Sequence, residues 1–293
     1  MVNQMQKLST DKLYEMARQL RRDVIKMLVI SKSGHSGGPI GLAEIFSALY
    51  FKILNIDPKN PKWSERDFFF LSAGHLAPVW YAALARAGYF PLEELATLRK
   101  IHSRLQGHPA PHHTHGVPGV EVASGSLGQG LSIAVGCALG LRLDKKKSRV
   151  YVLLGDGELD EGQIWEAAMT AAHHKVSNLT AIVDRNDCQI DNYTHNVMHL
   201  EPLTDKWKAF GWNVLECNGH SIEEFLDAVE KSKMCTDKPS VIIAKTYMGN
   251  GISFMHNDYK WHGVPPNEEQ ARQALSELKP TSFGDFIKFD WEK

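Results

Sequence analysis

Short apolar runs along the chain predict a set of strands that are covered on both faces. Each run is rich in β-branched or aromatic residues and is bounded by turn-forming residues. The runs are Asp67–Ser72, Val150–Leu154, Leu179–Val183, Trp212–Glu216 and Ser240–Ala244. Because they are apolar almost throughout rather than alternating, they are typical of a sheet with helices on both sides.

Segments with helical periodicity alternate with these runs. The predicted helices are one capped at Ser9–Asp11 and continuing to Leu28, then Gly41–Leu54, Pro78–Ala87, Leu92–Lys100, one opening after Gly128, Glu161–Ala168, Ser221–Lys233 and Glu268–Leu278. Strands that alternate with helices predict an α/β fold, a doubly wound and mostly parallel sheet with helices on both faces. We expect one domain over residues 1–293, with a tail from about residue 265.

Composition narrows the class of protein. Hydrophobic residues make up 43% of the chain and charged residues 23%, as in an ordinary globular protein. A net charge of −1 gives no field to attract nucleic acid or an anionic membrane. Met1–Thr10 is too polar for a signal peptide, and no apolar run reaches the length of a membrane span. The four cysteines lack pairing or metal spacing, so we expect reduced thiols and a cytoplasmic protein.

One strand–helix–strand unit carries candidate chemistry. Gly155-Asp156-Gly157 follows the strand at Val150–Leu154, and Asn186 follows the next strand. Neighbouring parallel strands end at the same edge of a sheet, so the two polar side chains are expected to lie together. One carboxylate and one amide oxygen suit Mg²⁺, which keeps positions open for phosphate oxygens. The unit therefore predicts a site that holds a diphosphate through a metal ion.

This pattern resembles the thiamine diphosphate motif, and the chain from about residue 10 to residue 266 resembles the N-terminal, diphosphate-binding half of transketolases. The resemblance implies that Asp156, Asn186 and the main-chain carbonyl of Cys188 ligate Mg²⁺, with Gly157 beside the cofactor. Ile or Leu is usual at the last position, and a main-chain ligand tolerates cysteine there. An acidic turn and a solvated asparagine in an ordinary nucleotide-type sheet would be the alternative explanation of the motif alone.

Four histidines in glycine-containing loops match active-site histidines of transketolases: His35, His75, His108 and His262. Thiamine chemistry moves protons on sugar hydroxyl and carbonyl groups, and histidine suits that task near neutral pH. The resemblance implies that His35, His108 and His262 meet substrate oxygens, while His75 and His262 also reach the cofactor phosphates. Any one of them alone would more often be an ordinary loop histidine.

Three further matches follow from the same resemblance. The segment Gly125-Ser126-Leu127 is expected to hold the aminopyrimidine ring with its backbone, and Lys245 is expected to contact the diphosphate. Glu161 matches a glutamate that reaches across the subunit interface. Each feature also has an explanation without a ligand. The glycine-containing segment could simply open a helix, Lys245 could be a surface lysine at the end of a strand, and Glu161 could stabilise its helix through the helix dipole. Gly38 departs from family members that have serine there, so one phosphate-side hydrogen bond is expected to be missing.

The long segment Ile101–Ser126 is rich in proline and histidine, and a loop of that length usually serves a site. Within it, His112-His113-Thr114-His115 invites a zinc interpretation. No cysteine or carboxylate cluster completes such a site, so we do not expect zinc there.

The resemblance covers nearly the whole chain, whereas complete transketolases are about twice as long as this chain. It therefore implies the N-terminal subunit of a split transketolase of pentose phosphate metabolism, which transfers a two-carbon ketol unit from a ketose phosphate to an aldose phosphate through thiamine diphosphate and Mg²⁺. Activity would require a separate C-terminal subunit, in a two-plus-two heterotetramer. The alternatives are a transketolase-like enzyme for a sulfo- or branched sugar, part of a 1-deoxyxylulose-5-phosphate synthase, and a cofactor-binding regulator without catalysis. The sequence leaves the donor and acceptor sugars open.

Overall fold

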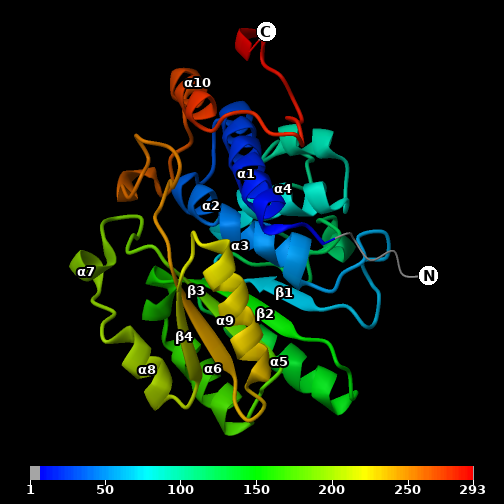
Figure 1. The fold of residues 1–293 in the computed structure, drawn as a ribbon, viewed down its shortest axis with the longest axis vertical. Helices are drawn as coiled ribbons and strands as arrows, with labels where there is room; N and C mark the ends of the chain where they lie inside the picture. The colour runs from blue at the N-terminus through cyan, green and yellow to red at the C-terminus, as the bar shows by residue number, and fades with distance from the viewer. Residues whose placement is uncertain (1–6, 293) are drawn as a thin grey trace.

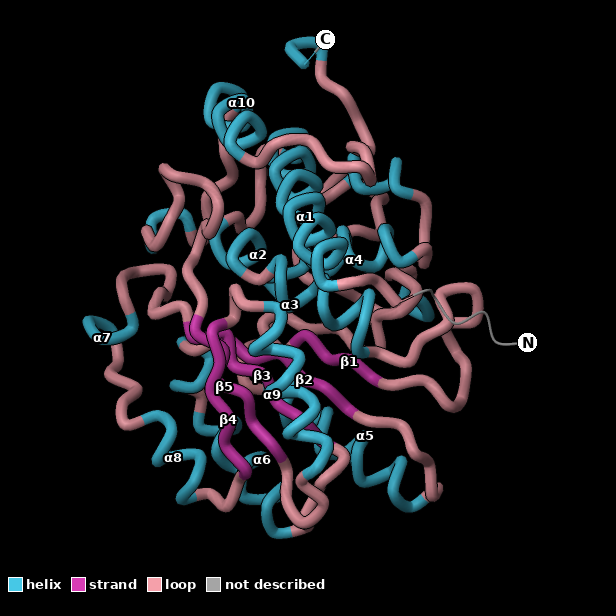
Figure 2. Tube along the Cα trace, viewed as in Figure 1, coloured by secondary structure: helices cyan, strands magenta, loops and turns pink. Residues whose placement is uncertain are grey.

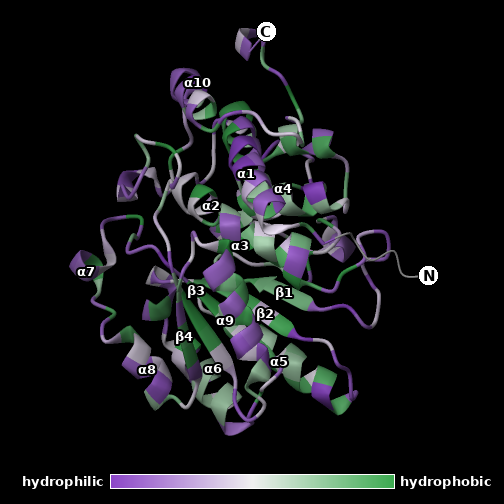
Figure 3. Ribbon diagram, in the orientation of Figure 1, coloured by the Kyte–Doolittle hydropathy of each residue, from purple (hydrophilic) through white to green (hydrophobic). Residues whose placement is uncertain are grey.

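A five-stranded parallel sheet lies at the centre of the computed structural model, which describes residues 7–292 (Figures 1 and 2). The strands run in the order β1-β2-β3-β5-β4. They are β1 (Phe68–Leu71), β2 (Val150–Gly155), β3 (Leu179–Arg185), β4 (Asn213–Asn218) and β5 (Ser240–Lys245). Figure 3 shows these strands largely in green, the colour of hydrophobic residues, as the apolar runs in the sequence predict. All five predicted strands and the α/β class are confirmed.

Helices cover both faces of this sheet. They are α1 (Thr10–Ser31), α2 (Gly37–Gly41), α3 (Ala43–Ala48), α4 (Ala77–Ala87), α5 (Gln129–Leu143), α6 (Gly162–His173), α7 (Thr194–Val197), α8 (Leu203–Ala209), α9 (Ile222–Met234) and α10 (Glu268–Glu277). A π-helical turn at Leu49–Ile53 and several 3₁₀ turns, including Leu92–Thr97 and Gly157–Asp160, complete the elements.

The strands supply two separate hydrophobic cores because successive side chains point to opposite faces. On β2, Tyr151 and Leu153 join the core made with α1, α3, α4, α9 and α10. Val150, Val152 and Leu154 join the core made with α5, α6 and α8. The doubly wound arrangement therefore follows directly from the continuous apolar runs.

Two local predictions were wrong. The helix expected over residues 41–54 is interrupted after α2 ends at Gly41, and α3 (Ala43–Ala48) then continues directly into the π-helical turn Leu49–Ile53. The glycine-rich stretch around His35, expected as a loop, is partly helical, since α2 begins at Gly37. Proline is compatible with the first turn of a helix, where N–H groups have no partner, so Pro39 does not prevent α2. A side chain at Gly37 would come within 2.2 Å of Met248, so glycine is required for this close packing.

The tail is fastened to α1. Arg22 forms a buried ion pair with Asp285, 2.6 Å apart, and Lys26 pairs with Asp285 at 3.3 Å. Arg272 lies over the ring of Trp291.

In the described residues no helix is both long and apolar enough to cross a bilayer, and all four cysteines are free thiols. The expectation about a signal peptide concerns residues that lie mostly outside the described part.

Candidate active site

The proposed metal ligands meet at the carboxyl edge of the sheet. Gly155 on β2 pairs with Asp184 on β3, so Asp156 and Asn186, which follow these positions, lie side by side. Asp156 is 1% exposed and Asn186 is 7% exposed. Both line a cleft of about 280 Å³ at this edge.

Asp156 is a buried carboxylate held by several donors. One oxygen accepts a hydrogen bond from the Gly157 N–H at 2.8 Å, and the other accepts from the Asp187 N–H at 2.7 Å and from Arg185 at 3.0 Å. Burial, followed by the charge of Asp184, raises the pKa of Asp156 to about 7 despite Arg185. Burial is the main cause, so a cation bound beside Asp156 would favour its ionised form.

The neighbouring oxygen donors suit a hard cation. Asn186 donates its amide N–H to Asp184 at 2.8 Å, so its carbonyl oxygen Oδ1 is directed toward Cys188, whose N–H it accepts at 2.9 Å. An amide oxygen has two lone pairs, and one remains for a ligand. In the described residues no cluster of three His, Cys, Asp or Glu side chains could hold a metal ion. The cleft instead presents the carboxylate of Asp156 and the amide of Asn186, with Cys188 lining it beside them, and oxygen donors of this kind are those that Mg²⁺ prefers.

The structure brings all four predicted histidines to the same cleft. The ring centre of His35 lies 5.0 Å from His75, 6.5 Å from His108 and 5.6 Å from His262. The rings of His75 and His262 are 5.0 Å apart. These residues lie up to 227 positions apart in the sequence, from His35 to His262 (262 minus 35), so only the fold assembles them.

The pKa values of the four histidines are lowered, which favours the neutral imidazole near neutral pH. Burial, with the charges of His262, His108 and Arg99, lowers the pKa of His35 to about 4. Burial also lowers the pKa of His75, of His108 and of His262. The Nδ1 atoms of His35 and His262 are buried and have no hydrogen-bond partner among the described residues. Buried polar atoms normally have partners, so these two nitrogens are suited to bind the oxygens of a ligand.

Glu158 is a site residue that the sequence did not reveal. It follows the Gly-Asp-Gly turn, yet it is 2% exposed and lines the cleft. Its carboxylate accepts hydrogen bonds from Gly128 N–H at 2.8 Å, Gly155 N–H at 3.0 Å and the Ser72 hydroxyl. It thus ties the turn after β2 to the loop before α5. A glutamate just after a turn is usually exposed, and its burial here depends on contacts that are remote in sequence.

The loop before α5 forms another wall of the cleft. Gly125 and Leu127 line it, and Gly125 has φ 146°, a conformation that favours glycine. A Cβ atom at Gly125 would lie 3.1 Å from the ring of His108. Gly38 also lines the cleft, and a Cβ there would lie 2.6 Å from Leu76. A side chain at position 38 would therefore require the end of the Leu76 side chain to shift.

Lys245 is not brought to this cleft. It ends β5 beside Arg185 and Asn218 and lines a separate cavity of about 610 Å³ with them. Side chains alternate along an extended chain, and the next residue, Thr246, is the one that points inward to hydrogen-bond Asp184. Ser126 and Glu161 are exposed beside the cleft but do not line it.

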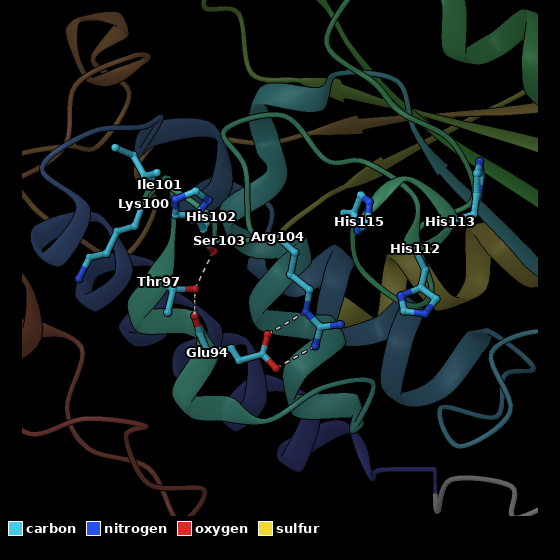
Figure 4. Close-up of a pocket in the computed structure, with 11 residues that line it drawn as sticks. Glu94, Thr97, Lys100, Ile101, His102, Ser103, Arg104, His112, His113 and His115 are labelled. Carbon is cyan, nitrogen blue, oxygen red and sulfur yellow. Dashed lines mark hydrogen bonds and ion pairs between the residues drawn. The ribbon is translucent and has the colours of Figure 1, made fainter.

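The expectation of no zinc at His112–His115 stays a prediction, and the structure shows only where these histidines lie. These histidines line a cavity of about 860 Å³, together with His102 and Arg104 (Figure 4). Arg104 is already paired with Glu94 at 2.8 Å. Figure 4 shows His112 and His113 pointing in different directions, and the described residues contain no metal-binding group of side chains.

Comparison with known proteins agrees with this geometry. The family model described as "Transketolase, thiamine diphosphate binding domain" matches residues 10–282. The chain belongs to the transketolase family. It is 44% identical over 266 residues to a 6-deoxy-6-sulfo-D-fructose transketolase subunit from Clostridium sp., covering 89% of this chain and 96% of the relative. It is 43% identical to one of the subunits of apulose-4-phosphate transketolase from Actinobacillus succinogenes, covering 93% and 98%.

Longer transketolases match only in part. Human transketolase is 39% identical over 91% of this chain, but the match spans 42% of the human protein. The crystal structure of transketolase from Campylobacter jejuni has a TM-score of 0.88 at 36% identity, covering 96% of this chain and 44% of that one. The chain therefore corresponds to the diphosphate-binding part of the transketolase family, and its relatives in this comparison are transferases.

Proposed function

We propose that this chain is the N-terminal subunit of a split transketolase. One observation carries the proposal. The chain spans 96–98% of relatives that are themselves called transketolase subunits, but less than half of the single-chain enzymes. A second polypeptide would then supply the remaining length, and we propose a two-plus-two assembly in the cytoplasm.

In this proposal the cleft holds thiamine diphosphate and Mg²⁺. Asp156, Asn186 and the Cys188 carbonyl would hold the metal, because they are adjacent oxygen donors at a buried site where a cation would favour the ionised form of Asp156. When bound, thiamine supplies an electron sink for breaking and forming a carbon–carbon bond. The backbone of Gly125 and Leu127, which line the cleft, would hold the pyrimidine ring, and Ser126 lies exposed between them. Lys245 stays outside the proposed set because it lines another cavity.

The chain's own side chains would handle protons and orient the sugar. Neutral imidazoles donate a hydrogen bond through one nitrogen and accept through the other. The unpartnered Nδ1 atoms of His35 and His262 suit the hydroxyl and carbonyl oxygens of a ketose. His75 and His108 complete the ring of imidazoles, and burial keeps this site less solvated than the surface. The substrates would be a ketose donor and an aldose acceptor, with the two-carbon ketol unit transferred between them.

A second candidate concerns the sugar. Two relatives are transketolases of 6-deoxy-6-sulfo-D-fructose and of apulose-4-phosphate. Their names favour an unusual sugar over an ordinary pentose phosphate, although the histidine cluster alone does not distinguish these substrates. Assaying sulfo-sugar, apulose-4-phosphate and xylulose-5-phosphate donors in parallel would separate the two candidates.

The test is reconstitution with the C-terminal transketolase subunit from the same genome. We expect the chain alone to bind thiamine diphosphate weakly and to transfer no ketol units, because in this proposal the partner supplies one wall of the cleft. Adding the partner should restore cofactor binding and turnover together. Robust turnover by the 293-residue chain alone would contradict the split-enzyme proposal. So would a stable complex that turns over none of the donors.

A further inference from the structure

Asp184 is a buried acidic residue that has no part in the function proposed above. It lies on β3, lines the cleft and is 2% exposed. One of its oxygens accepts a hydrogen bond from the Thr246 hydroxyl, and the other accepts one from the Asn186 amide at 2.8 Å. The adjacent Arg185 forms its ion pairs with other carboxylates. Burying a carboxylate is costly, so its place beside Asn186 calls for a reason.

The side-chain amide of Asn186 has two possible orientations of nearly the same shape, which exchange its oxygen and its NH₂ group. Its two neighbours decide between them. The Asp184 carboxylate accepts hydrogen bonds, whereas the main-chain N–H of Cys188 donates one. The NH₂ group therefore faces Asp184, and the oxygen faces Cys188 at 2.9 Å. The opposite orientation would place two acceptors together at Asp184 and two donors together at Cys188.

This orientation decides which atom Asn186 presents to a cation in the cleft. An amide oxygen can bind Mg²⁺, whereas an NH₂ group carries hydrogens that repel a positive ion. Residues that orient the ligands of a metal contribute strongly to its affinity, and replacing one typically costs about 10–100-fold. The contact between Asp184 and Asn186 is of this kind, because it turns the oxygen away from Asp184.

Asp184 is itself held in place by the neighbouring strand. It pairs in register with Ala244 on β5. Thr246, which follows β5, is 1% exposed and donates its hydroxyl hydrogen bond to Asp184. The main-chain N–H of Thr246 also donates to the Arg185 carbonyl at 3.1 Å. The carboxylate therefore has a fixed position before any ligand binds, as an orienting group requires.

We propose that Asp184 is a positioning residue, which holds Asn186 with its oxygen free to bind the metal. This inference rests on the proposed function, in which Asn186 is a ligand of Mg²⁺. The oxygens of Asp184 are engaged by Thr246 and Asn186, so Asp184 acts through the asparagine rather than on the ion. The property that matters is its ability to accept a hydrogen bond, not its negative charge.

Two substitutions of Asp184 separate these properties. Asp184→Leu removes both the charge and the acceptor. Asp184→Asn removes the charge but keeps an oxygen for Asn186, while its new NH₂ group can donate to the Thr246 hydroxyl, which also accepts. We expect Mg²⁺ affinity in the presence of thiamine diphosphate to fall about 10–100-fold in Asp184→Leu, and to stay within a few-fold of wild type in Asp184→Asn.

Thr246→Val is the matched control. Valine has nearly the shape of threonine, and the change removes the other hydrogen bond of Asp184 while the acceptor for Asn186 remains. We expect its Mg²⁺ affinity to resemble that of Asp184→Asn. Calorimetric titration of Mg²⁺ into the reconstituted subunits with thiamine diphosphate measures all four proteins, and circular dichroism shows whether each variant is folded.

Nuclear magnetic resonance of the chain labelled with ¹⁵N-asparagine reports the amide itself without metal or turnover. In wild type, the Asn186 NH₂ protons should exchange slowly with water, because the group is buried and bonded to Asp184. The same protection is expected in Asp184→Asn and its loss in Asp184→Leu. Rapid exchange in folded wild type would overturn the proposal even if Asp184→Leu did not fold.

The affinities give two further ways to overturn it. If Asp184→Asn loses as much Mg²⁺ affinity as Asp184→Leu, the charge rather than the acceptor is responsible. If Asp184→Leu binds Mg²⁺ as tightly as wild type, Asp184 does not position the ligand. In both cases the proposed metal site and the split enzyme stand. Failure of the wild-type subunits to bind Mg²⁺ with thiamine diphosphate would overturn the metal site and this inference together.

Discussion

The buried carboxylate of Glu158 accepts a hydrogen bond from the hydroxyl of Ser72, and that hydroxyl accepts one from the Gly130 N–H at 3.1 Å. This pair joins the end of β1 to the first turn of α5. Through Gly128, whose N–H also reaches Glu158, the pair fixes the loop that forms one wall of the cleft. Its geometry therefore bears on cofactor binding even though Ser72 does not line the cleft.

Replacing Glu158 should loosen this loop. In Glu158→Ala, the buried N–H groups of Gly128 and Gly155 lose their acceptor, which costs roughly 2–4 kcal/mol in the free energy of unfolding. We expect cofactor affinity in the complex to fall with it, and Glu158→Gln to lie between wild type and alanine, because one amide oxygen remains as an acceptor. Denaturant unfolding and cofactor titration measure the two effects. The double variant with Ser72→Ala should be less destabilised than the sum of the single variants.

Asp156→Asn should separate metal binding from folding. The change keeps the shape of the side chain but removes its charge, so we expect Mg²⁺-dependent cofactor affinity to fall roughly 100-fold or more. Asp187→Asn is the control, because the Asp187 side chain pairs with the same Arg185 at 2.7 Å but is 38% exposed. Calorimetric titration of cofactor and Mg²⁺ into the partnered enzyme gives both affinities. A wild-type value for Asp156→Asn would remove Asp156 from the metal site.

His35→Ala and His108→Ala should leave cofactor affinity within a few-fold of wild type and lower kcat. Their proposed contacts are substrate oxygens, and loss of a positioned acid–base group costs on the order of 10²–10⁴ in rate. His113→Ala is a suitable control because His113 is exposed in the neighbouring cavity. Steady-state kinetics with a ketose donor provides the measurement. Turnover near that of wild type would show that the tested histidine is a bystander.

The histidine cluster should make the free chain sensitive to acid. His35 has a pKa of about 4 when folded, against an ordinary value of 6.5, so the unfolded chain binds more protons between these values. Stability is therefore fully present above pH 6.5 and is lost as pH falls toward 4. We expect His35→Asn to reduce this loss by roughly 1–3 kcal/mol. Denaturant unfolding between about pH 4 and about pH 7 tests it, with His113→Asn as control. An unchanged pH dependence in His35→Asn would contradict the assignment.

Local sequence patterns were sufficient to predict the sheet, and the resemblance to transketolases supplied the candidate histidines that the fold brings to one cleft. The apolar run at Val150–Leu154 could only be a doubly covered strand, and its position fixed that of Asp156. The histidines were identified by their loop contexts. The positions of Glu158 and Lys245 could not be predicted from local sequence. Glu158 is buried and Lys245 is exposed, and both outcomes depend on the neighbouring strands and on the direction of each side chain. The short helices α7 and α8 were missed, since four and seven residues carry little periodicity.

The cleft lies where the two cores of the sheet come together. Leu76, from the core beneath α1 and α4, and Glu158, which precedes Leu159 of the other core, both line it. A ligand that fills this space contacts both layers at once. Its binding free energy would therefore oppose local opening of either layer, and amides on both faces of the sheet should exchange more slowly when the cofactor is bound.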